Sequence, residues 1–276
     1  MRFTIATWNM DHWKGVGRDR EHTAKVWQYV RELGVDVVLL QEAVAPPTGF
    51  DATVLPAPDA AARWHSGGRA AFGTAIAVFG HQVKEVDFGP LLGDRTARLT
   101  QTHAAAFVAA RVVVSGHEIT VVSLYGILEG PLLDKQTYAV TSMHRSLSDL
   151  TPLLNARSTM RVLGGDLNVS TQMRPPDRAA HRVVFDRIAA FGLGDCTRAT
   201  ASARQRLGNC ICEEGDACVH VQTHRNPRSP VPWQLDYLFA SEKQLMNRLT
   251  SCRAVDDDPR IWELSDHCPV VAEFEL

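Results

Sequence analysis

The sequence predicts an α+β fold of four layers, α/β/β/α, in which two mixed sheets pack face to face and helices cover their outer faces. Two observations support this. Short apolar runs with strand-like alternation recur along the 276 residues, and helical patterns are spaced between them. Because neither a repeat nor a long linker divides the chain, we expect a single domain over residues 1–276.

The predicted strands are apolar runs bounded by turn-forming residues. Two of these runs flank Ser115-Gly116-His117, a sequence that favours a tight hairpin turn. The runs cover residues 3–7, 35–40, 74–79, 105–114, 119–124, 161–163, 235–240 and 270–274.

The predicted helices repeat apolar residues three or four positions apart, and two of them end before a glycine suited to a helix C-terminus. In the first of these helices, Val26, Val30 and Leu33 recur before Gly34. The patterns cover residues 19–33, 135–154 and 181–191. Segments 44–70 and 197–233 lack periodicity and are rich in Pro, Gly and polar residues, which predicts functional loops.

The composition is that of a globular protein with ample core material, since 45% of residues are hydrophobic and 22% are charged. No signal-peptide pattern or membrane-length apolar stretch is visible, so we expect a cytoplasmic protein without membrane insertion, and a monomer. The formal net charge of -2 weighs against an enzyme dedicated to long duplex DNA, which usually carries a basic face.

Polar fragments follow or precede the apolar runs, so that rigid strands could hold acidic, amide and imidazole groups at the surface. Residues two apart in such a fragment, like Asp166 and Asn168, project to the same side of an extended backbone. The fragments are Trp8-Asn9-Met10-Asp11, Leu40-Gln41-Glu42, Gly164-Gly165-Asp166-Leu167-Asn168, Gln234-Leu235-Asp236-Tyr237 and Leu264-Ser265-Asp266-His267. Together they indicate one site assembled from distant segments, with chemistry suited to metal-assisted attack of water on a phosphoester.

This ordered set resembles the endonuclease/exonuclease/phosphatase superfamily, which includes apurinic endonucleases, deoxyribonuclease I, neutral sphingomyelinases and inositol-polyphosphate 5-phosphatases. The resemblance extends from position 8 to position 267, and it rests on the order of the fragments rather than on any one of them. It implies a metal-dependent phosphoesterase.

The resemblance implies that Glu42 is the main metal ligand, with Asn9, Asp11 and Asp266 at or near the metal. Carboxylate and amide oxygens suit Mg²⁺ or Mn²⁺, which prefer oxygen ligands. Taken alone, each of these residues would be an ordinary strand-end or turn residue.

The same resemblance implies the catalytic residues. Asp166 would position or deprotonate the attacking water, and Asn168 would donate to phosphoryl oxygens. His267, oriented by Asp236, would bond a phosphate oxygen or assist proton transfer. Tyr125 falls where several family members contact the scissile phosphate, with packing in the core or rim as the alternative.

Arginines in the variable loops could clamp one or two phosphates at the rim of a pocket, because a guanidinium matches phosphate oxygens bidentately. Arg174 and Arg225 are the substrate-binding candidates. The set comprises Arg174, Arg178, Arg204, Arg206, Arg225 and Arg228.

Cys210, Cys212, Cys218 and His220, with His224 beyond them, form a further group. A structural zinc site, free thiols and a local disulfide all stay open. The C-x-C and C-x-H spacings depart from the usual C-x₂₋₄-C pairs and weigh against zinc. We expect these residues to lie together on a loop beside the site.

The predicted function is divalent-metal-dependent phosphoester hydrolysis, most simply by a nuclease-like phosphodiesterase that uses in-line attack of water. The partner would be a phosphoester such as a short nucleic acid or a small phosphodiester. One alternative is a phosphomonoesterase acting on a small anionic or lipid-headgroup substrate. A second, from another class, is a non-catalytic binding module on the same fold.

Overall fold

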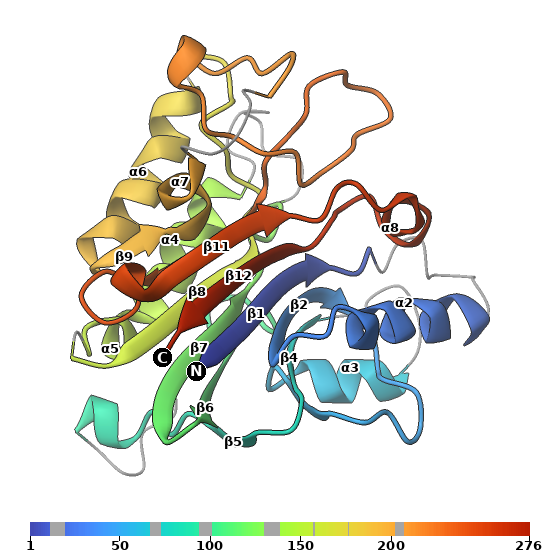
Figure 1. The fold of residues 1–276 in the computed structure, drawn as a ribbon. Helices are drawn as coiled ribbons and strands as arrows, with labels where there is room; N and C mark the ends of the chain where they lie inside the picture. Colours follow the sequence, from blue (N-terminus) through green and yellow to red (C-terminus); the bar gives the residue numbers. More distant parts are fainter. Residues whose placement is uncertain are drawn as a thin grey trace.

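The fold consists of two mixed six-stranded sheets packed face to face (Figure 1). The structure is a computed structural model that describes residues 1–11, 20–66, 73–93, 101–129, 139–156, 158–175, 177–201 and 207–276. The predicted fold class is confirmed.

Each sheet contains one parallel pair of strands, β1 with β2 and β7 with β8, and its other described pairs are antiparallel. Sheet A runs in the order β11 (Leu249–Ala254), β12 (Val270–Glu275), β1 (Arg2–Asn9), β2 (Val37–Ala43), β4 (Gly73–Val78) and β3 (Thr53–Pro56). Sheet B runs in the order β5 (Gln82–Glu85), β6 (Phe107–Val114), β7 (His117–Leu124), β8 (Met160–Asp166), β10 (Asp236–Ser241) and β9 (Leu193–Asp195).

Helices lie on both outer sides of the two sheets, as Figure 1 shows. The α-helices are α2 (Arg20–Glu32), α3 (Ala60–Ser66), α4 (Val140–Asp149), α5 (Thr151–Leu154), α6 (Asp177–Ala190), α7 (Cys196–Ala199) and α8 (Pro259–Leu264). Short 3₁₀ turns are η1 (Pro90–Leu92), η3 (Gly215–Ala217) and η4 (Met246–Arg248). No helix among the described residues is both long and apolar enough to cross a bilayer.

Three apolar clusters build the layers, because alternate residues of each central strand point to opposite faces. Ile5 and Val162 belong to the cluster between the sheets. Trp8 packs outward with Trp27 of α2, and Leu163 packs outward in the cluster that includes α4 and α6. The central strands are therefore buried on both faces, which gives the site a rigid base.

The hairpin prediction is confirmed. β6 and β7 pair up to Val114 and His117, and both Ser115 (φ 54°) and Gly116 (φ 82°) adopt the left-handed conformation that a two-residue hairpin turn requires.

Two expectations need correction. The predicted helix at 135–154 is described only from residue 139. Its described part is not one helix but two, α4 and α5, which are separated at Leu150. Pro152 explains the division, because proline has no N–H to continue the hydrogen bonding of α4. The two predicted loop segments are not wholly irregular. The described part of 44–70 contains β3 and α3, and 197–233 begins within α7 and contains η3.

Candidate active site

The site lies where matching ends of the two sheets meet. β1 and β2 are parallel and end on the same side of sheet A, with Asn9 as the last residue of β1 and Glu42 as the second-last residue of β2. In sheet B, β8 ends at Asp166, directly opposite Asp236 at the start of its antiparallel neighbour β10. His267 precedes β12, which begins beside the end of β1. The topology therefore brings together side chains that are far apart in the sequence.

Asn9 links the two sheets where these strands end. Its amide nitrogen donates to Asp166 Oδ2 at 2.9 Å and lies 3.5 Å from Glu42 Oε1. Its own oxygen accepts the backbone N–H of Asp11 at 2.9 Å. This arrangement suits a residue that orients the two carboxylates.

The two carboxylate oxygens of Glu42 differ in their hydrogen bonding. Oε1 accepts the Tyr125 hydroxyl at 2.7 Å, whereas Oε2 is buried and has no hydrogen-bond partner among the described residues. Burial raises the pKa of Glu42, and burial followed by the charge of Glu42 raises the pKa of Tyr125, which stays a protonated donor.

These features fit a divalent cation. A small hollow of about 20 Å³, enough for one water-sized species, is bordered by Glu42 and Asp11 among others. A buried carboxylate oxygen without a partner is costly unless a cation or a proton compensates it. Glu42 and Asp11 are thus suitably placed to hold Mg²⁺ or Mn²⁺.

Asn168 fixes the loop after β8 in the left-handed conformation, with φ 51°. Its backbone N–H donates to Asp166 Oδ1 at 3.0 Å, and its side-chain nitrogen donates to Asp166 Oδ2 at 3.1 Å and to the Gly126 carbonyl at 3.0 Å. Both amide hydrogens are therefore used within the protein, which suits positioning of Asp166 better than donation to phosphoryl oxygens.

His267 and Asp236 form the expected buried pair, with Nδ1 and Oδ2 2.8 Å apart. The two side chains therefore lie within hydrogen-bond reach, as the expected orientation of His267 by Asp236 requires. His267 Nε2 lies 3.8 Å from Asp166 Oδ2 and 3.9 Å from Asp266 Oδ1. It therefore faces the space between these two carboxylates.

The charges of this group shift two pKa values. Burial alone would lower the pKa of His267, but the charges of Asp236 and Asp166 outweigh it and raise this pKa to about 10. Burial raises the pKa of Asp166 to about 7, although the charge of His267 opposes the shift. Without a cation, a protonated imidazole therefore faces a carboxyl group that titrates near neutral pH.

Two residues of the recognised fragments received no role from the sequence but hold the site in place. Ser265 Oγ donates to the Asn9 carbonyl at 2.8 Å and accepts the His267 N–H at 3.0 Å. Trp8 Nε1 donates to the His267 carbonyl at 2.9 Å. Nothing in the local sequence indicates these bonds, which connect the two ends of the chain.

His224 belongs to the active site rather than to the cysteine group beside which it stands in the sequence. Its ring centroid lies 4.6 Å from that of His267, and its Nε2 lies 3.9 Å from Asp266 Oδ2. Next to it, the Arg225 N–H donates to the Asp266 carbonyl at 2.8 Å, and its exposed guanidinium stacks 3.8 Å above Trp262. Arg225 thus stands at the rim of the site.

The other loop arginines differ in position. Arg174 and Arg228 are exposed, and no described contact joins either side chain to Asp166 or His267. Arg178 is buried, donates to the Thr171 carbonyl at 3.0 Å and pairs with Glu213, so it is not a rim residue as the sequence suggested. Arg204 and Arg206 lie outside the described residues.

The four residues Cys210, Cys212, Cys218 and His220 lie together, as predicted, and all three cysteines are free thiols, which excludes the local disulfide. A cavity of about 410 Å³ opens beside this group and α6. Neither Glu42 nor any other carboxylate of the active site lines this cavity, so it is a separate feature.

Residues 6–267 match the model of the endonuclease/exonuclease/phosphatase family. The chain belongs to this family and is a phosphoester-hydrolysing enzyme of the nuclease/phosphatase type. A search of curated protein sequences returned no match.

Solved structures with the same fold include the AP endonuclease of Archaeoglobus fulgidus, which is 18% identical with a TM-score of 0.63 and covers 99% of this chain and 100% of its own. The AP endonuclease LMAP from Leishmania major is 17% identical with a TM-score of 0.66, over 100% and 88%. A 3′ phosphatase, NExo from Neisseria, bound to a product DNA hairpin, is 18% identical with a TM-score of 0.60, over 99% and 100%. At these identities the likeness shows the fold alone.

Proposed function

We propose that this enzyme is a divalent-metal-dependent phosphodiesterase that hydrolyses a short or small phosphodiester by in-line attack of water. The proposal rests mainly on one observation. Glu42, Asp166 and the His267–Asp236 pair come from both sheets and meet where their strands end or begin. The DNA product in one structural neighbour is consistent with a nucleic-acid substrate.

Each residue has a role that its contacts support. Glu42 and Asp11, which border the same hollow, would hold Mg²⁺ or Mn²⁺, which neutralises phosphate charge when bound. Asp266, beside His267, is a further candidate ligand that we infer from the family resemblance. His267, protonated and held by Asp236, donates from Nε2 to a non-bridging phosphate oxygen. Asp166, whose pKa is raised by burial, would accept a proton from the attacking water.

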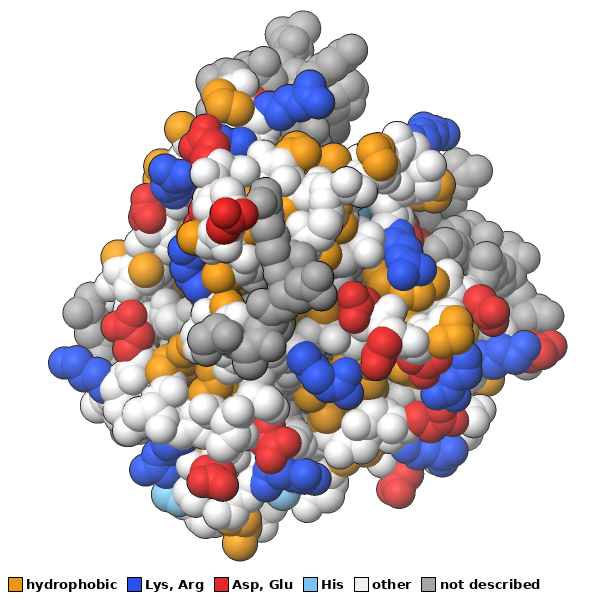
Figure 2. All heavy atoms as spheres, turned by 45° about the horizontal axis from the view of Figure 1, so that its top comes forward, with side chains coloured by type: hydrophobic (Ala, Val, Ile, Leu, Met, Phe, Trp, Pro, Cys, Tyr) orange, Lys and Arg blue, Asp and Glu red, His pale blue; other side chains and the backbone are white. Residues whose placement is uncertain are grey.

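The surface supports a short substrate. Lys and Arg side chains are interspersed with Asp and Glu over the face in Figure 2, and the described residues show no continuous basic stripe there. With 29 basic and 31 acidic residues, the chain lacks the excess positive charge typical of proteins that follow long nucleic acid.

The proposal is tested with bis-p-nitrophenyl phosphate, p-nitrophenyl phosphate, single- and double-stranded DNA, RNA and phosphoinositides, each with Mg²⁺ or Mn²⁺. We expect hydrolysis of diesters, loss of activity in EDTA and recovery when the cation is restored. Full activity in excess chelator would contradict the metal requirement. Faster hydrolysis of the monoester than of every diester would favour the phosphomonoesterase alternative.

His267→Ala provides a second test, and it should lower kcat by about 10²–10⁴-fold, the range for a positioned acid–base group. The matched control is His144→Ala in α4, which should keep the wild-type rate. A His267→Ala enzyme as fast as the wild type would show that catalysis takes place elsewhere.

A further inference from the structure

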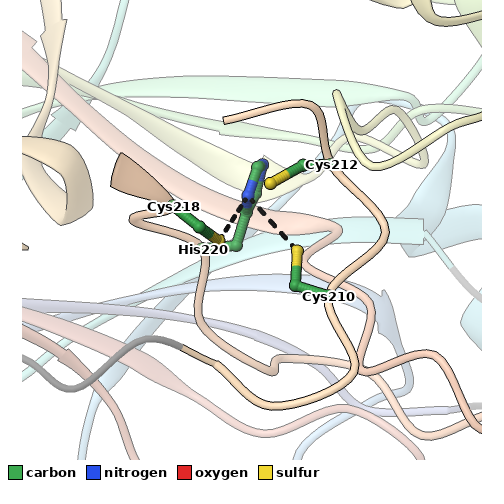
Figure 3. A group of neighbouring side chains, drawn as sticks. All are labelled: Cys210, Cys212, Cys218 and His220. Atoms are coloured by element: carbon green, nitrogen blue, oxygen red, sulfur yellow. Dashed lines mark hydrogen bonds between the residues drawn. The ribbon is translucent and has the colours of Figure 1, made fainter. Parts of the chain in front are cut away.

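Three cysteines and one histidine from an irregular segment point toward one another, as Figure 3 shows. Their ligand atoms, the sulfurs of Cys210, Cys212 and Cys218 and a ring nitrogen of His220, all lie within 4.8 Å of one another. Cys218 and His220 are both 8% exposed. The group thus forms a partly buried S₃N donor set that shares no residue with the groups of the active site.

The separations match tetrahedral coordination of zinc. His220 Nδ1 lies 3.4 Å from Cys218 Sγ and 3.7 Å from Cys210 Sγ. Zn–S bonds of about 2.3 Å and Zn–N bonds of about 2.0–2.1 Å at tetrahedral angles place nitrogen and sulfur about 3.6 Å apart. The donor atoms therefore already have the spacing that one Zn²⁺ ion would impose.

The groups around these donors fit a metal site as well. Thr171 Oγ1 lies 2.8 Å from His220 Nε2, and a proton on Nε2 leaves the Nδ1 lone pair facing the sulfurs. Gln172 donates to Cys210 Sγ at 3.3 Å. Metal-bound histidines usually hydrogen-bond through their second ring nitrogen in this way.

Backbone N–H groups also point at the sulfurs. Each cysteine receives a backbone hydrogen bond from the residue two positions later, which favours the thiolate form. Zinc binds the thiolate form of cysteine, so these hydrogen bonds favour the form that a metal site requires.

We propose that Cys210, Cys212, Cys218 and His220 bind one structural Zn²⁺ ion. The C-x-C and C-x-H spacings, which weighed against zinc in the sequence, allow it in the structure. Neither pair lies in a helix, Cys218 has an extended backbone, and residues two apart on such a backbone project to the same side. The turn η3 lies between the two pairs and reverses the chain, so that the second pair lies beside the first.

The zinc ion would fasten the segment that supports the active site. Past His220, Thr223 Oγ1 accepts the N–H groups of Leu235 and Asp236 at 2.9 and 3.1 Å. On the other side, Gln172 joins the loop after Asn168 to this segment by accepting the Gln234 N–H at 2.7 Å. A cross-link at the cluster therefore stabilises the loops next to Asp236 without contacting substrate.

The test is the zinc content of the full-length protein after dialysis, measured by plasma mass spectrometry, together with zinc X-ray absorption. We expect about one zinc ion per chain, with three sulfurs at about 2.3 Å and one nitrogen at about 2.0–2.1 Å. Cys212→Ser and Cys218→Ser should lose the ion. Cys252→Ala, a buried cysteine outside the cluster, and His267→Ala, in the active site, should retain it.

Substoichiometric zinc in the wild type after growth with added zinc, or retention of zinc in both cysteine variants, would overturn the proposal. A sulfur-free zinc signal would also overturn it, because the ion would then lie among the oxygen and imidazole groups of the active site. If the cysteine variants do not fold, X-ray absorption of the wild type decides. None of these readouts depends on hydrolytic activity, so failure of the proposed function leaves the test intact.

Discussion

Asn9 shows how single residues unite this site. Its amide nitrogen reaches Asp166 on the other sheet and lies near Glu42 on its own, so one side chain sets the separation of two carboxylates. Two buried carboxylates near each other resist ionisation unless donors or a cation compensate them. The donors here are Asn9 and Tyr125, and the imidazole of His267 lies 3.8 Å from Asp166 Oδ2 as a charge partner.

The buried Oε2 of Glu42, which has no hydrogen-bond partner among the described residues, leads to a first prediction. Glu42→Ala should lower kcat by at least about 10²-fold, because it removes a main electrostatic element of the site. The protein should remain folded, as judged by circular dichroism and thermal unfolding. The matched control is Glu85→Ala at the exposed edge strand β5, where the rate should not change. Equal rates in the two variants would remove Glu42 from the mechanism.

His181, beneath the loop after Asn168, leads to a second prediction about pH. Its buried Nδ1 accepts the Ser170 N–H at 3.1 Å, and burial lowers its pKa to about 4, although Asp177 opposes the shift. The unfolded chain takes up this proton near pH 6.5, whereas the folded protein does so only near pH 4. The stability that His181 contributes is thus fully present above pH 6.5 and is lost as the pH falls toward 4.

The measurement is the free energy of unfolding in urea at several pH values between 7 and 4. The decrease toward pH 4 should be smaller in His181→Gln, whose side chain can still accept the Ser170 N–H, than in the wild type. His117→Gln, at the start of β7, serves as the control and should follow the wild type. Parallel curves for the wild type and His181→Gln would contradict the assignment.

At the scale of elements, close packing of β8 against β7 positions Asp166. A Cβ at Gly165 would overlap the backbone oxygen of Leu124, and no side-chain movement could relieve that overlap. Gly165→Ala should therefore reduce the free energy of unfolding by about 3 kcal/mol or more, the upper end of typical overpacking costs. Thermal and denaturant unfolding measure this change.

Gly208→Ala is the matched control, because a Cβ at Gly208 meets no described atom within 4 Å. Its stability should stay within about 0.5 kcal/mol of the wild type, as is usual for surface substitutions. Wild-type stability in Gly165→Ala would mean that β7 and β8 can separate without cost.

Some strands could not be predicted from the sequence pattern. The strands that it did not predict are β3, β5, β9 and β11, and each lies at an edge of its sheet. They are short and partly exposed, so their side chains do not show the strong apolar alternation of central strands. Pairing with an inner strand, rather than local sequence, makes them strands.

For the whole molecule, the balance of charges leads to a prediction about salt. Binding to a phosphodiester substrate should weaken only moderately as ionic strength rises, because few counterions are released when one or two phosphates are bound. Affinity for an uncleaved duplex can be measured with His267→Ala across a range of salt concentrations. Tight duplex binding at physiological salt, with a slope implying six or more phosphate contacts, would refute the short-substrate proposal.

The sequence by itself determined the central strands, because long runs buried on both faces carry an unmistakable apolar pattern, and it determined which polar residues stand at their ends. Only the tertiary structure decided how those ends meet. Three features depend on the packing of the two sheets. They are the hydrogen bond between His267 and Asp236, the position of Asn9 between two carboxylates, and the location of His224 in the active site rather than with the cysteines. Such contacts join residues distant in the chain, and no local propensity encodes them, because their geometry is set by the shared core between the sheets.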